Sequence, residues 1–189
     1  MTASPRLRMD GVACLRGGRL LFEGLDLGLE AGEAALVTGA NGAGKSSLIR
    51  IAAGLLRPAA GRVERGAAAA LADESLALDP KLPLGRALAF WAGLDGADPA
   101  AGMEAMGLSR LAGVPVRMLS TGQRKRAALA RVIAAGAALW LLDEPANGLD
   151  AEGEARLAEA MSAHLAAGGA ILAASHQPLG LEAAHRVAL

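Results

Sequence analysis

One octapeptide, Gly39-Ala40-Asn41-Gly42-Ala43-Gly44-Lys45-Ser46, limits the possible folds of this chain more than any other feature. It reads G-x-x-x-x-G-K-S, a pattern in which glycines let backbone N–H groups turn inward around phosphates. The lysine ammonium then reaches the outer phosphates, and the serine hydroxyl binds Mg²⁺. Residues 33–38 predict a short buried strand before the loop, and residues 45–54 predict a helix that ends at a glycine. The N-terminus of that helix would direct its partial positive charge at the phosphates.

The length and composition of the chain are compatible with one sizeable domain. Its 189 residues include 19 basic and 19 acidic side chains, and this balance gives no sign of a nucleic-acid-coating protein. The single Cys14 can form neither an internal disulfide nor a metal site by itself, which suits a reducing compartment. The N-terminal residues lack the apolar run of a signal peptide, and no stretch reaches the roughly 20 apolar residues of a membrane span. If the protein works at a membrane, we expect another chain to provide the span.

The first part of the chain predicts strands, and the middle predicts helices. Residues 7–29 alternate loosely and predict two or three short antiparallel strands, and 62–65 predict an edge strand. Residues 67–72 are compatible with a buried strand or part of a helix, and periodicity does not decide between them. Between 73 and 118, prolines separate short helical stretches, which predicts a small helical insertion. A long helix over 117–135 begins near Ser120.

Two later strands deliver polar side chains at their ends. Residues 139–142 form a continuous apolar run, typical of a buried parallel strand, and Asp143 and Glu144 follow directly. Asp143 fits the carboxylate that orders Mg²⁺ in phosphate-loop enzymes, and Glu144 could act as general base on an attacking water. The alternative is a pair of solvated acids at a strand end. A further buried strand over 170–174 delivers His176 to the edge where open α/β sheets hold ligands, although a lone histidine there can also be structural.

Residues 119–123, Leu-Ser-Thr-Gly-Gln, form either a second anion-binding turn or an ordinary serine N-cap. They resemble the L-S-G-G-Q signature of ABC ATPases, and they precede the Asp143-Glu144 strand as that family requires. Residues 147–150 resemble the family's D-loop, with Asp150 in the aspartate position, and His176 resembles its switch histidine. The resemblance covers nearly the whole chain. It implies an α/β P-loop ABC-type ATPase with a mixed central sheet, an N-terminal antiparallel β-subdomain and an inserted α-helical subdomain.

The resemblance also implies a domain division and a set of site residues. A single domain, 1–189, would comprise a core of 1–72 and 136–189 and a helical signature subdomain of 73–135. ATP and Mg²⁺ would be the cofactors. Lys45, Glu144 and His176 would be catalytic, and Ser46 and Asp143 would bind the metal. Nucleotide would contact Gly39, Ala40, Asn41, Gly42, Ala43, Gly44, Lys45, Ser46, Ser47, Arg16, Ser120, Thr121, Gly122, Gln123 and Asp150.

Three positions depart from the family pattern. Thr121 stands where the signature usually has glycine, and a β-branched residue resists positive φ, so we expect nucleotide affinity or turnover to be tuned there. Arg16 occupies the place of the aromatic residue that usually stacks on adenine; a guanidinium plane can stack on a base instead. The glutamine expected at the start of the helical insertion is absent, and Glu74 or Ser75 occupies its place near the metal.

The family resemblance further implies partners. Two copies would form a head-to-tail dimer that holds each ATP between the Lys45 loop of one and the Ser120 signature of the other. Integral membrane permease subunits would complete the complex, at the cytoplasmic face of a bacterial inner membrane. Within the family, residues 14–22, 84–92, 139–148 and 174–178 resemble the small ATP-binding subunits of haem exporters in cytochrome c biogenesis. The alternative is the ATPase of another small ABC transporter. A translation or DNA-repair ABC protein usually needs tandem cassettes or long coiled-coil insertions, and neither is present.

Overall fold

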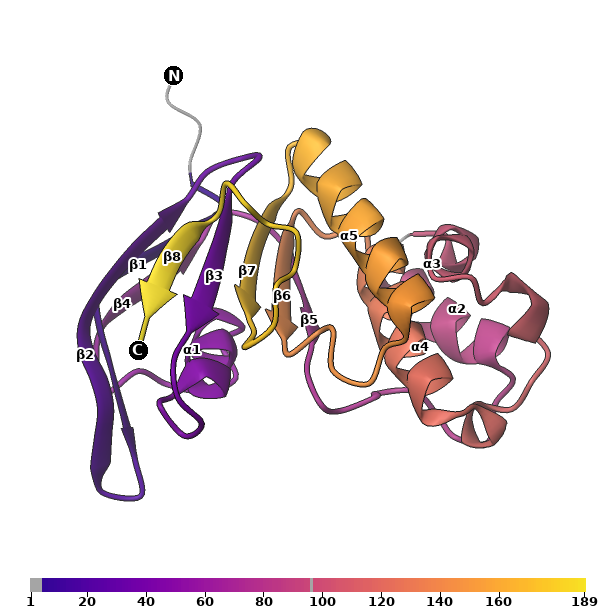
Figure 1. The fold of residues 1–189 in the computed structure, drawn as a ribbon, viewed down its shortest axis with the longest axis horizontal. Coiled ribbons are helices and arrows are strands. Elements are labelled where there is room, and N and C mark those ends of the chain that lie inside the picture. Colours follow the sequence, from indigo (N-terminus) through magenta and orange to yellow (C-terminus); the bar gives the residue numbers. More distant parts are fainter. Residues whose placement is uncertain (1–4, 96) are drawn as a thin grey trace.

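The computed structural model describes residues 5–95 and 97–189, which form two sheets flanked by helices (Figure 1). The strands are β1 (Leu7–Arg16), β2 (Arg19–Leu29), β3 (Ala34–Thr38), β4 (Ala60–Arg65), β5 (Ala69–Ala72), β6 (Leu139–Asp143), β7 (Ala170–Ala174) and β8 (His185–Ala188). The helices are α1 (Lys45–Ala52), α2 (Leu84–Asp95), α3 (Pro99–Ala105), α4 (Thr121–Ala134) and α5 (Ala151–Ala166), and short 3₁₀ turns span Ser109–Leu111 and Val116–Met118.

The first sheet is antiparallel and has the order β2-β1-β4. β1 and β2 form one long hairpin that turns at Gly17 and Gly18, both with positive φ. Gly24 also has positive φ but lies inside β2 and does not end it. The sequence therefore located the antiparallel segment correctly, whereas the strands are longer than the short ones it predicted.

The second sheet is parallel, with the order β5-β6-β7-β3-β8. The separate antiparallel β-subdomain expected from the sequence is present, and the pairings between the described strands of the central sheet are all parallel. Residues 69–72 are a strand, which resolves the open choice between strand and helix. β8, which pairs with β3 at the sheet edge, was not predicted from the sequence. Because the strands are parallel, all of their carboxyl ends lie along one edge.

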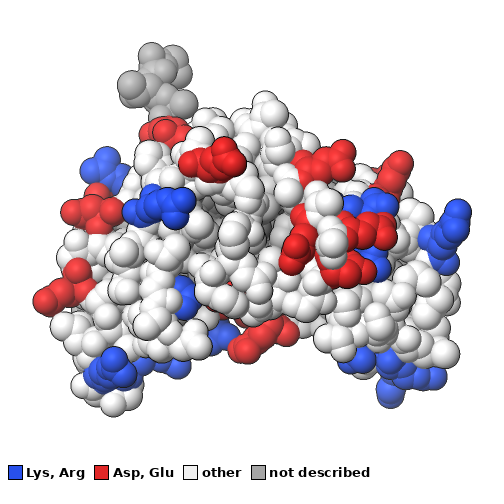
Figure 2. All heavy atoms as spheres, in the orientation of Figure 1, with Lys and Arg blue, Asp and Glu red and all other residues white. Residues whose placement is uncertain are grey.

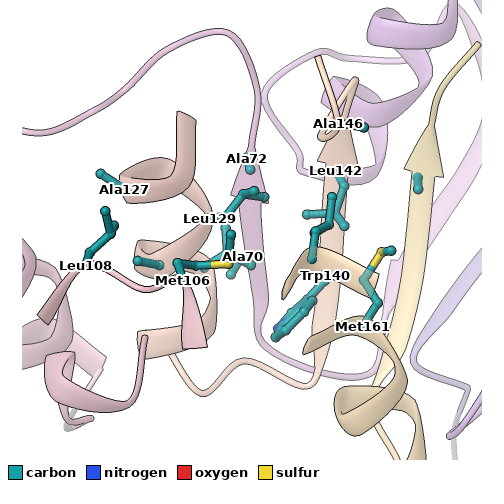
Figure 3. Packing of buried hydrophobic residues seen from close by; sticks show 14 of the residues in the cluster. Ala70, Ala72, Met106, Leu108, Ala127, Leu129, Trp140, Leu142, Ala146 and Met161 are labelled. Carbon is teal, nitrogen blue, oxygen red and sulfur yellow. The ribbon is translucent and has the colours of Figure 1, made fainter. Parts of the chain in front are cut away.

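The parallel sheet separates two hydrophobic cores. On one face, α1 and the antiparallel sheet enclose Leu139 and Leu141 of β6. On the other, helices α2 to α5 enclose Trp140 and Leu142, as seen around the labelled residues in Figure 3. The Trp140 ring stacks on the His164 imidazole of α5, with centroids 3.9 Å apart. Alternate side chains of a strand point to opposite faces, so β6 contributes to both cores.

Helices α2 and α3 lie at the end of the molecule opposite the β1–β2 hairpin (Figure 1). Arg131 of α4 connects this end to the parallel sheet, because its Nη2 donates to the Leu71 carbonyl of β5. The division into a core and a helical subdomain of 73–135 stays a prediction. No helix in the described part of the chain combines the length and apolar character needed to span a membrane.

Candidate functional site

The loop between β3 and α1 depends on glycines with positive φ. Gly39, Gly42 and Gly44 have φ of 146°, 81° and 114°. At Gly44, the residue before α1, an added Cβ would lie 3.0 Å from the Phe22 ring and 3.2 Å from the Leu21 Cβ. Both the backbone conformation and the limited space therefore disfavour a side chain there. The strand–loop–helix arrangement that the sequence predicted is present.

Lys45 lies across this loop. Its Nζ donates to the carbonyl oxygens of Gly39 (2.9 Å) and Ala40 (3.3 Å), and the residue is only 7% exposed. The ammonium is thus held where the backbone amides of the loop and the N-terminus of α1 also concentrate positive potential. This is an electrostatic environment suited to an anion.

A hollow of about 490 Å³ opens beside Lys45 and gathers residues from distant parts of the sequence. It is lined by Arg16, Leu21, Asn41, Gly42, Gly44, Lys45, Ser46, Ser47, Glu144, Asn147 and His176. Arg16 comes from β1, whereas Glu144 and His176 follow β6 and β7. A larger hollow of about 620 Å³ between α1 and β4 is lined mainly by arginine, glycine and apolar residues and has no carboxylate, serine or histidine. The chemistry therefore favours the smaller hollow.

Asp143, at the end of β6, is 8% exposed, and its Oδ1 is buried without a hydrogen-bond partner among the described residues. Burial raises the pKa of this carboxyl above its ordinary value, and a hydrogen bond with the Ser46 side chain opposes the increase. The adjacent charge of Glu144 also raises it. A buried carboxylate oxygen without a partner costs free energy, which a bound cation would relieve.

Glu144 and His176 form a pair across two neighbouring strands. His176 Nδ1 lies 2.8 Å from Glu144 Oε2, and the Glu144 N–H donates to the Ala174 carbonyl at 2.8 Å. Glu144 has a φ of 46°, an uncommon value for a residue with a side chain. Such strain persists only when the surroundings hold it, and here it directs the carboxylate toward the hollow that Lys45 also lines.

Comparisons with known proteins identify the family. The family model for ABC transporters matches residues 22–147. The cytochrome c biogenesis ATP-binding export protein CcmA of Sphingopyxis alaskensis is 61% identical over 178 residues, which cover 93% of this chain and 92% of that protein. Its counterpart of the same name in Novosphingobium aromaticivorans is 61% identical over 179 residues, covering 94% and 92%. The chain belongs to the CcmA family of ABC transporter ATP-binding subunits.

The fold agrees with this membership. A solved structure of the ATP-binding subunit of an ABC transporter superposes with a TM-score of 0.85 at 23% identity, covering 97% of this chain and 85% of the other. The relatives confirm the family predicted from the sequence, and this superposition confirms the predicted α/β fold class. As a CcmA-family member, the chain is an ABC-type ATPase subunit.

The signature stretch of this CcmA-family chain is a helix N-terminus, and its residues do not line the hollow. Ser120 caps α4: its Oγ accepts from the Gln123 N–H at 3.2 Å, and Gln123 Oε1 accepts from the Ser120 N–H at 2.9 Å. Thr121 is the first residue of α4, and its φ is not positive. The backbone reason for expecting nucleotide affinity or turnover to be tuned at Thr121 is therefore absent, because helical φ suits threonine, and the effect itself stays a prediction. Gly122 lies close to the D-loop, since an added Cβ would be 3.3 Å from the Gly148 carbonyl oxygen.

The D-loop aspartate and the candidates for the missing glutamine have other partners. Asp150 caps α5, where its Oδ1 accepts from the Gly153 N–H at 2.9 Å. The exposed Glu74 pairs with Arg50 of α1, and the Ser75 N–H donates to Asp73 Oδ1. Neither Glu74 nor Ser75 lines the hollow.

Two residues near the site were missed from the sequence. Asp73 comes directly after the Ala72–Leu142 pair on β5, as Asp143 does on β6, and this repeat of position could have identified it. Lys125, on α4, is partly buried; burial lowers its pKa, and the charges of Asp143, Glu144 and Asp73 oppose that decrease. No local signal separates Lys125 from the arginines beside it, because its environment is created by strands far away in the sequence.

Proposed function

We propose that this chain binds and hydrolyses Mg·ATP in the hollow beside Lys45, and so powers an export step of cytochrome c biogenesis. The observation that carries the proposal is the convergence of Lys45, the Ser46–Asp143 pair and the Glu144–His176 pair at one edge of the parallel sheet. The relatives named above are ATP-binding export proteins of cytochrome c biogenesis, and 61% identity over nearly their whole length supports the same role here.

The nucleotide phosphates would lie on the loop of residues 39–47. Backbone N–H groups from Gly39, Ala40, Asn41, Gly42, Ala43, Gly44 and Ser47 would surround them, and Lys45 would contact the outer phosphates. Arg16 lines the same hollow from β1. Its guanidinium plane is suited to stack on the base, in the role that the sequence assigned to it.

Mg²⁺ fits the residues present. Asp143 Oδ1 is buried without a partner, and the Ser46 side chain shares a hydrogen bond with the same carboxylate. The Asp143 carboxylate and the Ser46 hydroxyl both provide oxygen ligands, which Mg²⁺ prefers. The bound ion would neutralise charge on the transferred phosphoryl group.

Glu144 would accept a proton from the attacking water. His176 holds one carboxylate oxygen of Glu144 through Nδ1, and the strained backbone of Glu144 fixes the direction of the side chain. The exposed part of the His176 ring lines the hollow, from where it could contact the terminal phosphate. Positioned groups of this kind contribute typically 10²–10⁴-fold to rate.

A second copy of the chain would complete each site. The hollow of a single chain is not lined by the signature residues or by the D-loop aspartate, namely Ser120, Thr121, Gly122, Gln123 and Asp150. A role for them in nucleotide binding therefore requires that they come from a partner copy. The N-terminus of α4, with its orphan N–H groups, would supply that contact. ATP bound between the two copies would stabilise the closed dimer, and loss of the terminal phosphate would release it.

ABC ATP-binding subunits of this type work with membrane subunits. We place the permease contact on α2, where Phe90 and Leu94, one helical turn apart, are 61% and 65% exposed. This contact would hold the chain on the cytoplasmic face of a bacterial inner membrane. On the face shown in Figure 2, basic and acidic side chains are interspersed with uncharged surface, which agrees with a partner other than nucleic acid.

The transported species would be haem or a haem-related molecule; the alternative is the ATPase of another small ABC transporter. The test uses tagged Glu144→Gln with ATP, added to detergent-solubilised membranes, with Glu159→Gln on α5 as the matched control. Loss of hydrolysis with retained ATP binding in Glu144→Gln alone supports the base assignment, and unchanged turnover refutes it. Co-purified cytochrome c maturation permeases and haem absorbance support the export role, whereas an unrelated permease supports the alternative.

A further inference from the structure

Asp73 lies beside Asp143 at the carboxyl edge of the parallel sheet. β5 and β6 are in parallel register, with Ala69 opposite Leu139 and Ala72 opposite Leu142. The residue after each member of the last pair is an aspartate, so Asp73 and Asp143 both lie one position beyond the Ala72–Leu142 pair at the same edge of the sheet. The sheet therefore brings a second carboxylate to the edge where Ser46 and Asp143 meet.

The side chain of Asp73 is fixed rather than free in solvent. It is 15% exposed, its Oδ1 accepts from the Ser75 N–H at 2.9 Å, and its Oδ2 lies 3.8 Å from Arg50 Nη2. Arg50 belongs to α1, the helix that begins at the phosphate-binding loop. Glu74 contacts the same Arg50 Nη2 at 3.1 Å, but its side chain is 86% exposed. Two adjacent acids thus share one guanidinium, and only Asp73 is largely buried.

Asp143 has an unsatisfied oxygen at this edge of the sheet. Its Oδ1 is buried and has no partner among the described residues. Two carboxylates on neighbouring strands, one of them with an unsatisfied oxygen, produce a negative potential that a divalent cation would relieve.

We propose that Asp73 is a further residue of the divalent-cation site, acting through its charge alongside Asp143. It takes the place that the sequence gave to Glu74 or Ser75, neither of which faces Asp143 across the sheet. Arg50 sets the orientation of Asp73 and thereby connects the cation site to α1. This inference rests on the proposed function, because it assumes that the cation binds with nucleotide at Ser46 and Asp143.

The test compares Asp73→Asn with Glu74→Gln. Each change removes one negative charge from a partner of Arg50, and asparagine retains the oxygen that accepts from the Ser75 N–H. Binding of Mn²⁺ is measured by electron paramagnetic resonance with a non-hydrolysable ATP analogue present. Binding of the analogue without metal and the thermal unfolding midpoint are measured in parallel.

We expect Asp73→Asn to weaken Mn²⁺ binding by about three- to tenfold, the order expected for losing one charge near a divalent ion. Glu74→Gln should leave it within about twofold, because an exposed charge is screened. Metal-free analogue binding and the unfolding midpoint should not change, and Asp73→Glu should restore part of the affinity. Equal Mn²⁺ affinity in wild type and Asp73→Asn, or equal losses in both variants, overturns the inference. Failure of the wild type to bind the analogue would instead overturn the proposed function.

Discussion

Gly102 and Gly93 both lie inside helices, yet we expect opposite effects from replacing them with alanine. Gly102, in α3, is buried against α4. An added Cβ there would lie 3.1 Å from the Ala134 Cβ and 3.0 Å from the Ala130 carbonyl carbon, and it would overlap the Ala130 oxygen more closely than real Cβ atoms approach. Gly93, in α2, has no atom within 4 Å of the same position.

The magnitudes follow from two opposing terms. Alanine is favoured over glycine inside a helix by about 1 kcal/mol, and this is the only term at Gly93. Overpacking costs about 1–3 kcal/mol, and the Gly102 contact lies at the upper end because a backbone oxygen cannot rotate away. Gly102→Ala should therefore lower the free energy of unfolding by about 2 kcal/mol, and Gly93→Ala should raise it by about 0.5–1 kcal/mol.

Urea unfolding and thermal scans of the two variants beside wild type provide the measurement. For a chain of this size, we expect a midpoint about 4–8 °C lower for Gly102→Ala and about 1–4 °C higher for Gly93→Ala. If Gly102→Ala is as stable as wild type, α3 does not pack on α4 as described. If Gly93→Ala is also destabilised, the steric explanation fails for both.

Three further changes test other contacts. Ser120→Ala removes the cap of α4 and should cost about 1 kcal/mol in urea unfolding, whereas Ser120→Asp should retain most of it. Burial lowers the pKa of His164 below its ordinary 6.5. Between the lowered pKa of the folded state and the ordinary pKa of the unfolded state, the folded chain therefore binds fewer protons. The stability that the neutral imidazole provides is fully present above about pH 6.5 and is lost as the pH falls below that value. Urea unfolding on both sides of about pH 6.5 should therefore show a smaller change in unfolding free energy for His164→Phe than for wild type. An equal change in the two proteins contradicts the assignment. Trp91→Phe removes the indole N–H that donates to the Ala77 carbonyl, where φ is 51°, and should cost about 1 kcal/mol and speed amide exchange within residues 73–83.

The features predicted best from the sequence are those that local pattern determines. The loop at 39–46 requires glycines and a lysine in fixed positions, and apolar runs of strand length flank it, so its strand and helix were both located. The same applies to β6 and β7, whose buried runs end at Asp143 and before His176. The convergence of these residues follows from the parallel sheet, which places every strand end at one edge.

The features that the sequence did not predict depend on distant partners. β8 is short and largely exposed, and only its pairing with β3 makes it a strand. Asp73 was passed over in favour of Glu74 and Ser75, because its burial comes from the register with β6 and from Arg50. Thr121 was compared with a family glycine because a β-branched residue resists positive φ, but α4 begins there and its φ is not positive.

β6 contributes side chains to both hydrophobic cores, and this affects how the molecule unfolds. Leu139 and Leu141 support one side while Trp140 and Leu142 support the other, and all four are buried. Disruption of either side withdraws packing from the strand on which the other side rests. Local opening of the hairpin or of α2 can occur independently, but the two cores should melt together in one cooperative transition. The amides of β6 would then exchange with solvent only through global unfolding.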